Sequence, residues 1–293
     1  MSSYSYPQMH PKVKPIVFWF MRLYARIVNF FFVKRLDAEG MENISDTKPI
    51  IFAATHANSF YDAILLHIET KRYVHALARG DAFNNKAVAF ILDLVHILPI
   101  WRITEGKQNM AKNNQTFDRC HELLRNNKQV LIYPEGRCKN QTTLLPLKRM
   151  GTSAMALRAW KDGIDAEVVP VVSTYDSFKN FGKRINLRVA KPLRKEDFDL
   201  TQDPAEFAKV FTAKLTEEME AMIDHNFKPV GFLRNLVHYL GWLIHLPLFL
   251  FIHWFTKRKF GRTIFFDSVW YGIYYVTAGT YWLLLGIFIS QFL

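Results

Sequence analysis

Cysteine is scarce in this chain of 293 residues, and basic residues clearly outnumber acidic ones. The two cysteines, Cys120 and Cys138, exclude a disulfide framework and show no metal-binding spacing, so reduced thiols are expected. With 38 Lys and Arg against 26 Asp and Glu, the formal net charge is +12, which predicts attraction to polyanions. Nucleic acid and anionic lipid surfaces are the two obvious classes.

Long runs of Lys and Arg are also missing, as are internal repeats, low-complexity segments and any helix-turn-helix or RNA-binding signature. These absences speak against a nucleic-acid partner. Aromatic residues are abundant instead: they make up 15% of the chain, include 25 Phe, and gather at its two ends. This distribution favours a membrane, and anionic membrane lipid is the expected partner of the positive charge.

The N-terminal segment is strongly apolar over residues 16–33, but Arg22 and Arg26 interrupt it on one helical face. Each arginine would cost about 2.5–3.5 kcal/mol in the middle of a spanning helix. A helix lying in the membrane interface suits this pattern, and residues 1–36 are expected to form one. A helix packed on the soluble domain is the alternative. A signal peptide is disfavoured because no small-residue cleavage site follows.

Residues 37–228 alternate short β-rich runs with helical patterns, which predicts an α/β sheet covered by helices. Functional residues are then expected where loops leave the strand ends. The predicted strands are residues 49–54, 73–78, 97–102, 129–133, 167–173 and 185–190. The predicted helices are residues 60–69, 84–95, 107–126, 151–161 and 204–223.

The tail, residues 229–293, holds two apolar stretches at 233–255 and 264–293, separated by a basic loop at 257–262. Each stretch is long enough to cross a bilayer core of about 30 Å. Polar or helix-bending residues interrupt both stretches: His238, His245, Pro247, His253, Asp267 and Gly272. A membrane-embedded hairpin is predicted. Because short basic loops tend to stay cytoplasmic, we expect the first stretch to be re-entrant and residues 257–262 to lie on the catalytic side.

A histidine follows the predicted strand 49–54, and His56 is separated from Asp62 by a short polar segment. Histidine titrates near neutrality and can act as a general base, while a carboxylate can orient it. Residues six apart do not share a helical face, so the chain must turn between them. Asn58 and Ser59 supply the turn, with Ser59 as a helix N-cap. The alternative is a plain helix start resembling a capping box.

Three further segments follow in order. Residues 97–102 end in Arg102, residues 131–137 read Leu-Ile-Tyr-Pro-Glu-Gly-Arg, and Pro170 lies inside the strand 167–173. Between the last two, Lys148 and Arg149 precede a helix that begins near Gly151. Together with the His–Asp motif, this set resembles the glycerolipid acyltransferase family, whose best-known member acylates 1-acylglycerol-3-phosphate. The likeness covers about residues 53–172.

The resemblance implies a mixed central sheet and assigns site residues. His56 would be the base and Asp62 its orienting partner. Arg102 would bind the acceptor's phosphate, Glu135 and Gly136 would form the acceptor-binding turn, and Arg137 and Lys148 would be further phosphate-binding cations or else plain surface charges. Acyl-CoA or acyl carrier protein thioester would be co-substrate, with no metal and no resident cofactor. Because thioesters are cytosolic, the catalytic region should face the cytoplasm, in a bacterial inner membrane rather than endoplasmic reticulum.

The sequence departs from the family pattern at two points. Five residues separate His56 from Asp62, where four are usual, and this resembles a branch that includes some glycerol-3-phosphate acyltransferases. The third motif reads Tyr-Pro-Glu-Gly-Arg-Cys rather than Phe-Pro-Glu-Gly-Thr. The expected acceptor is 1-acylglycerol-3-phosphate, giving phosphatidic acid; glycerol-3-phosphate or an amino-acid-based lysolipid is the alternative. An inactive membrane-tethering protein of the same fold is a third reading.

Overall fold

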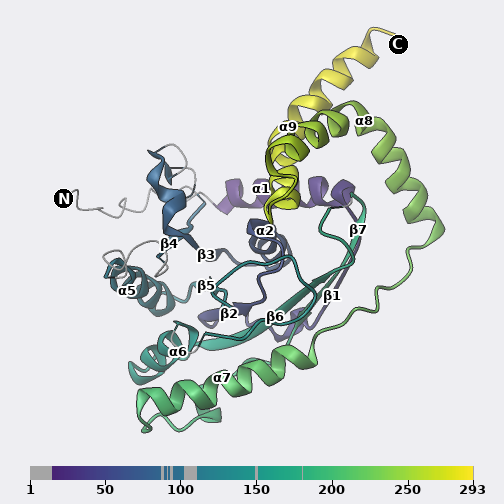
Figure 1. Ribbon diagram of the computed structural model, residues 1–293. Coiled ribbons are helices and arrows are strands. Elements are labelled where there is room, and N and C mark those ends of the chain that lie inside the picture. Colours follow the sequence, from purple (N-terminus) through teal and green to yellow (C-terminus); the bar gives the residue numbers. More distant parts are fainter. Residues whose placement is uncertain are drawn as a thin grey trace.

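A seven-stranded sheet organises the computed structural model, which describes residues 15–86, 89–90, 92, 95–101, 111–148, 151–179 and 181–292 (Figure 1). The strands are β1 (Val33–Glu39), β2 (Ile50–Ala54), β3 (Val74–Arg79), β4 (Leu98–Ile100), β5 (Gln129–Ile132), β6 (Glu167–Tyr175) and β7 (Lys183–Val189). The helices are α1 (Pro15–Phe32), α2 (Phe60–Glu69), α5 (Lys112–Arg125), α6 (Gly151–Lys161), α7 (Pro204–Ala221), α8 (Phe232–Phe260) and α9 (Phe266–Ser290).

The strand order is β1-β7-β6-β2-β5-β3-β4, and β6 and β7 pair antiparallel while the other strand pairs are parallel. The sheet is therefore mixed, as predicted. The carboxyl ends of β2, β5 and β6 meet at one edge of the sheet. Because β7 reverses direction and β1 follows it, β1 begins at this same edge.

Both faces of the sheet are buried. Ile51 and Ala53 of β2 belong to the cluster shared with α5, α6 and α7, whereas Ile50 and Phe52 point to the opposite face and share a cluster with Leu66 of α2. This alternation follows from the two-residue period of a strand. A strand buried on both faces needs a continuous apolar sequence, and β2 has one.

All six predicted strands are present, with ends within two residues of those expected. The helices at 60–69 and 151–161 also match, and α7 ends two residues early. In the helix expected at 84–95, residues 86, 89, 90 and 92 are helical, and residues 87, 88, 91, 93 and 94 lie outside the described ones. A short 3-10 helix covers Gly80–Asn84. Strand β1 was not predicted, because its sequence carries charges at Lys34, Arg35 and Asp37. An edge strand tolerates such charges.

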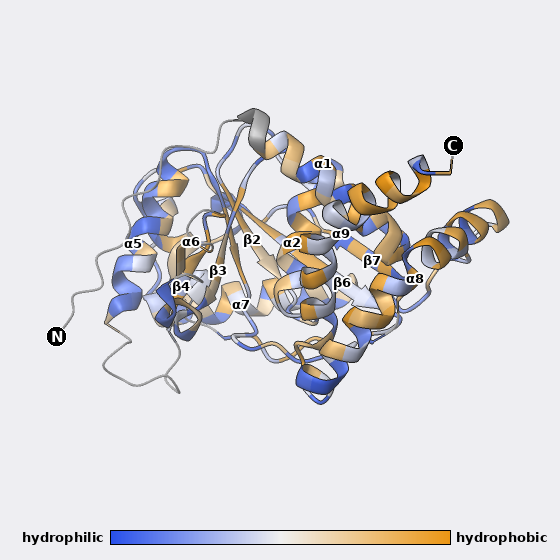
Figure 2. Cartoon of the chain, turned by 90° about the horizontal axis from the view of Figure 1, so that it is seen from above, coloured by the Kyte–Doolittle hydropathy of each residue, from blue (hydrophilic) through white to orange (hydrophobic). Residues whose placement is uncertain are grey.

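Helices α1, α8 and α9 gather along the edge of the sheet where β2 ends, and they share an aromatic core that includes Phe32, Phe249, Trp270 and Tyr271 (Figure 1). Helices α8 and α9 are each long and apolar enough to cross a membrane. Figure 2 shows their hydrophobic colouring continuing onto outward-facing turns. Large apolar side chains such as Leu250, Trp254 and Leu283 are exposed there.

Candidate active site

His56 and Asp62 meet at the carboxyl end of β2, and the loop between them turns as the sequence predicted. The ring nitrogen Nδ1 of His56 lies 3.2 Å from Oδ2 of Asp62. The Asp62 side chain is only 2% exposed, whereas the His56 side chain is 15% exposed. The pair therefore has a buried carboxylate behind an imidazole whose Nε2 side is directed away from the carboxylate, which is the arrangement of an oriented general base.

The carboxylate of Asp62 receives two further hydrogen bonds. The backbone N–H of Asn58 donates to Oδ2 at 2.8 Å, and the hydroxyl of Tyr175 donates to Oδ1 at 2.5 Å. Ser59 does precede α2, but its side chain makes no capping hydrogen bond, and its φ of 50° is left-handed. The predicted cap is thus wrong in its chemistry: the loop is held by the inward-turned Asp62 instead of the Ser59 hydroxyl.

The Tyr133–Gly136 turn at the end of β5 supports His56 from the other side. The Tyr133 ring stacks on the imidazole, with centroids 3.8 Å apart and planes at 13°. Glu135 is buried; its Oε2 accepts the backbone N–H of His56 at 3.1 Å, and its Oε1 accepts that of Leu145 at 3.2 Å. Burial raises the pKa of Glu135, while these two donors oppose the rise. Glu135 therefore fixes the backbone that carries the base.

The other predicted substrate-binding residues lie at the surface near Glu135, with the exception of Arg102. Gly136, Arg137 and Lys148 are exposed beside the same turn. Gly136 has a φ of +66°, and a Cβ there would lie 3.0 Å from Cγ of Lys148, so glycine suits the position. The backbone N–H of Lys148 donates to the carbonyl of Pro134 at 2.7 Å. Arg102 lies outside the described residues.

A second set of buried polar groups touches the catalytic loop from the C-terminal hairpin. Asn58 donates from Nδ2 to Oδ2 of Asp267, at the start of α9, at 2.6 Å. The same carboxylate forms an ion pair with Lys183 of β7, whose side chain is 0% exposed. The loop that carries His56 is therefore tied directly to the hairpin.

Sequence reasoning missed Tyr175, Lys183 and Asp267 as parts of the site. They come from β6, β7 and α9, and no local motif marks them. Tyr133 could have been found, because it precedes the Pro-Glu-Gly turn that was recognised. No group of three or more His, Cys, Asp or Glu side chains converges as a metal site within the described ranges.

Comparisons with known proteins bear on this geometry. A model of the acyltransferase family matches residues 35–174, from within β1 to the penultimate residue of β6, and the matched range includes His56 and Asp62. The human 1-acyl-sn-glycerol-3-phosphate acyltransferase beta is 25% identical over 170 residues, or 58% of this chain. Residues 35–174 are a domain of the glycerolipid acyltransferase family. The alignment with the human protein spans 56% of that protein's length, little more than half.

The acyltransferase domain also has a counterpart among solved structures. The crystal structure of the 1-acyl-sn-glycerophosphate acyltransferase PlsC from Thermotoga maritima superposes with a TM-score of 0.52 at 16% identity. The match covers 72% of this chain and 82% of the other. At this identity the likeness establishes the fold, which is the mixed sheet flanked by helices described above.

Proposed function

We propose that the chain is a membrane-bound O-acyltransferase of phospholipid biosynthesis. It transfers a fatty acyl group from an acyl thioester, carried by coenzyme A or acyl carrier protein, to the free hydroxyl of 1-acylglycerol-3-phosphate, and phosphatidic acid is the product. The observation that carries the proposal is the oriented pair of His56 and Asp62 at the end of β2. The domain's family and the activity for which its human relative is named support this acceptor.

The pair supports transfer in one displacement. His56 takes the hydroxyl proton on Nε2 while its Nδ1–H donates to Asp62, whose charge stabilises the imidazolium. The acceptor oxygen attacks the thioester carbonyl and forms a tetrahedral intermediate. The carbon–sulfur bond then breaks, and the thiolate takes the proton back from His56. A thioester is already activated, so no covalent acyl-enzyme is needed.

We assign recognition of the phosphate to three cations, Arg102, Arg137 and Lys148. Arg102 is proposed to bind the acceptor's phosphate, because a guanidinium offers two parallel donors and a permanent charge. Arg137 and Lys148 are exposed beside Gly136, where they can meet the phosphate of the acceptor or of the donor. The same arrangement accommodates glycerol-3-phosphate or an amino-acid-based lysolipid as the second candidate acceptor.

Membrane attachment is proposed for residues 1–36 and 229–293, with the catalytic region, residues 37–228, on the cytoplasmic face. Exposed aromatic and aliphatic side chains on α1, α8 and α9 support this placement. Two contacts support a first helix that does not cross: Arg234 near the start of α8 donates to the carbonyl of Val33, and Asp267 at the start of α9 accepts from Asn58. Both ends of α8 are thus near the catalytic edge, and residues 257–262 would lie on its side.

The test is incubation of the full-length protein with labelled acyl-CoA or acyl carrier protein and a panel of glycerol-based acceptors, with the products separated as lipids. The proposal expects labelled phosphatidic acid with 1-acylglycerol-3-phosphate. Label in 1-acylglycerol-3-phosphate formed from glycerol-3-phosphate alone would instead select the second acceptor. No labelled product with any acceptor would favour the inactive tethering protein.

A further inference from the structure

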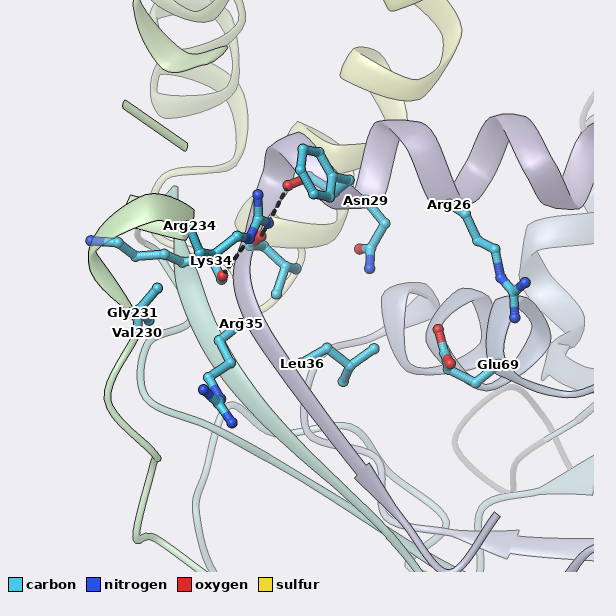
Figure 3. Close-up of a pocket in the computed structure, with 11 residues that line it drawn as sticks. Arg26, Asn29, Lys34, Arg35, Leu36, Glu69, Val230, Gly231 and Arg234 are labelled. Atoms are coloured by element: carbon cyan, nitrogen blue, oxygen red, sulfur yellow. Dashed lines mark hydrogen bonds between the residues drawn. The ribbon is translucent and has the colours of Figure 1, made fainter. Parts of the chain in front are cut away.

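A basic pocket lies between the end of α1, the start of β1 and the start of α8 (Figure 3). Its volume is about 380 Å³. Four of its lining residues are cationic and one is acidic: Arg26, Lys34, Arg35, Arg234 and Glu69. The pocket is therefore positively charged and belongs to a part of the molecule that the catalytic motifs do not include.

Two of the four cations are compensated nearby. Arg35 donates to both carboxylate oxygens of Asp37, at 2.6 and 2.9 Å. Glu69 lies beside Arg26 in Figure 3, and the charges of Arg26 and Arg22 oppose the rise that burial causes in the pKa of Glu69. These groups hold the wall together, and the excess charge must come from the other two cations.

Lys34 and Arg234 provide that excess. Lys34 donates to the hydroxyl of Tyr239 at 3.1 Å. Arg234 donates to the backbone carbonyls of Phe30, Val33 and Lys34, and its guanidinium lies 3.8 Å from the centroid of the Phe30 ring. Neither cation has an ion pair with a carboxylate in the part of the chain that the structure describes. Because no carboxylate balances them, both charges can attract an external anion.

The start of α8 adds further positive potential to the pocket. Gly231 is the N-cap of this 29-residue helix, makes no side-chain cap and lines the pocket. A Cβ added to Gly231 would meet no atom within 4 Å, so the space beside it is open. The first backbone N–H groups of a helix lack intrahelical acceptors and favour an anion.

Large apolar side chains adjoin the pocket. Phe30 of α1 lines it, and Phe232 and Leu233 at the start of α8 are 84% and 72% exposed. These apolar side chains would not stabilise a bound free phosphate ion, whereas a phospholipid could pack its acyl chains against them. Cations beside exposed apolar and aromatic side chains are the combination with which interfacial helices bind anionic lipid.

The pocket is separate from the acceptor site. It opens at the start of β1, while His56 follows β2, and β7 and β6 lie between these strands. At about 4.8 Å per strand the separation is about 14 Å, too far for a glycerol hydroxyl at His56 to share its phosphate with this pocket. Both sites nevertheless lie at the same edge of the sheet.

We propose that this pocket binds the phosphate of an anionic phospholipid of the surrounding membrane, with Lys34, Arg234 and the α8 amides as ligands and the lipid's chains over Phe30, Phe232 and Leu233. The proposal rests on the membrane attachment in the proposed function, but on none of its catalytic assignments. In this proposal, part of the chain's positive charge binds a specific membrane lipid that is not the substrate.

The experiment is native mass spectrometry of the full-length protein released from neutral detergent micelles that contain phosphatidylglycerol and phosphatidylcholine. The wild type should retain one phosphatidylglycerol in preference to phosphatidylcholine. Lys34→Gln should weaken that retention about fivefold, since one cation near lipid phosphate contributes about 1 kcal/mol. Lys34→Arg should restore it. Lys257→Gln, which removes an exposed cation of the hairpin outside the pocket, is the matched control and should retain the lipid.

Equal loss of lipid in Lys34→Gln and Lys257→Gln, or full retention in Lys34→Gln, would show that this pocket is not the lipid-binding site. Displacement of the lipid by an equal concentration of inorganic phosphate would overturn the lipid as its occupant. Acyl transfer measured on the same samples separates the two proposals: a wild type that binds lipid selectively but transfers no acyl group contradicts only the proposed function.

Discussion

Two buried carboxylates from different helices hold the same loop. Asp62 lies in the first turn of α2, and Asp267 lies in the first turn of α9. Each accepts a hydrogen bond from Asn58: the backbone N–H donates to Asp62, and the side-chain amide donates to Asp267. The catalytic domain and the C-terminal hairpin therefore each contribute a carboxylate from the first turn of a helix to the loop that carries His56.

Their remaining partners differ, and the difference separates their roles. Asp267 is paired with Lys183, a fully buried cation, so its charge is already neutralised. Asp62 is surrounded by neutral donors, the Tyr175 hydroxyl and a backbone N–H, and by the imidazole of His56. Its negative charge remains available for an imidazolium. Two carboxylates at equivalent positions acquire different functions from their surroundings.

The largest effect on acyl transfer should come from the base itself. His56→Ala should lower turnover by about 10²- to 10⁴-fold, because positioned acid–base catalysis contributes this range. The thermal unfolding temperature should change little, since the side chain is partly exposed at a loop. Steady-state assays with circular dichroism as the folding control measure both; near-normal turnover would remove His56 from the chemistry.

Asp62→Asn should lower turnover by about 10²- to 10⁴-fold, because the amide cannot stabilise the imidazolium and presents the wrong partner to Nδ1. The bond from the Asn58 backbone can persist to the amide oxygen, so the loss of stability should be about 1 kcal/mol or less. Turnover and denaturant unfolding of the same preparation give the two values. A large stability loss with little change in turnover would make Asp62 a structural residue.

Arg102→Ala should raise the KM for a phosphorylated acceptor about tenfold or more while leaving the KM for the acyl donor nearly unchanged. A charge-assisted hydrogen bond to phosphate contributes about 1.5–3 kcal/mol, and only the acceptor should lose it. Initial rates over a grid of both substrates separate the two constants. Equal rises in both would assign Arg102 a shared or structural role.

Asp267→Asn should do the opposite of Asp62→Asn: a large loss of stability and a smaller loss of turnover. Leaving Lys183 buried without its counter-ion should cost about 3–5 kcal/mol of stability. Turnover per folded molecule should fall less than in Asp62→Asn, because the reacting groups stay in place. Ser268→Ala removes the neighbouring buried hydroxyl of α9 and its hydrogen bond to the Phe265 carbonyl. As the matched control, it should cost only about 0.5–1.5 kcal/mol of stability and leave turnover unchanged. A larger turnover loss than in Asp62→Asn would contradict the separation of roles.

No effect on activity is expected from Lys259→Cys, which reports the side of the basic loop. In sealed right-side-out vesicles an impermeant maleimide should leave this cysteine unmodified until the membrane is opened, with the unsubstituted chain as control for Cys120 and Cys138. Modification in sealed vesicles would refute the re-entrant arrangement of α8 and favour a full crossing.

The strands and the catalytic pair could be predicted because their signals are local. The apolar sequence of β2 identifies a central strand, and the polar residues after it require the turn that brings His56 to Asp62. Strand β1 escaped prediction because its charges fit an exposed edge. The Asn58–Asp267 contact joins residues 209 apart, and the Tyr175–Asp62 contact joins residues 113 apart. Only the folded sheet brings such residues together, so no motif could reveal them.

The central claim is that His56 activates the acceptor for direct transfer, and thiol release tests it most directly. Mixing the full-length protein with acyl-CoA should release free coenzyme A only when acceptor is present, and His56→Ala should abolish the release. One equivalent of thiol released without acceptor, with label left on the protein, would contradict the account. Cys138 would then be the nucleophile to examine. Its Sγ accepts the backbone N–H of Ser59, in the loop that carries His56, at 3.1 Å.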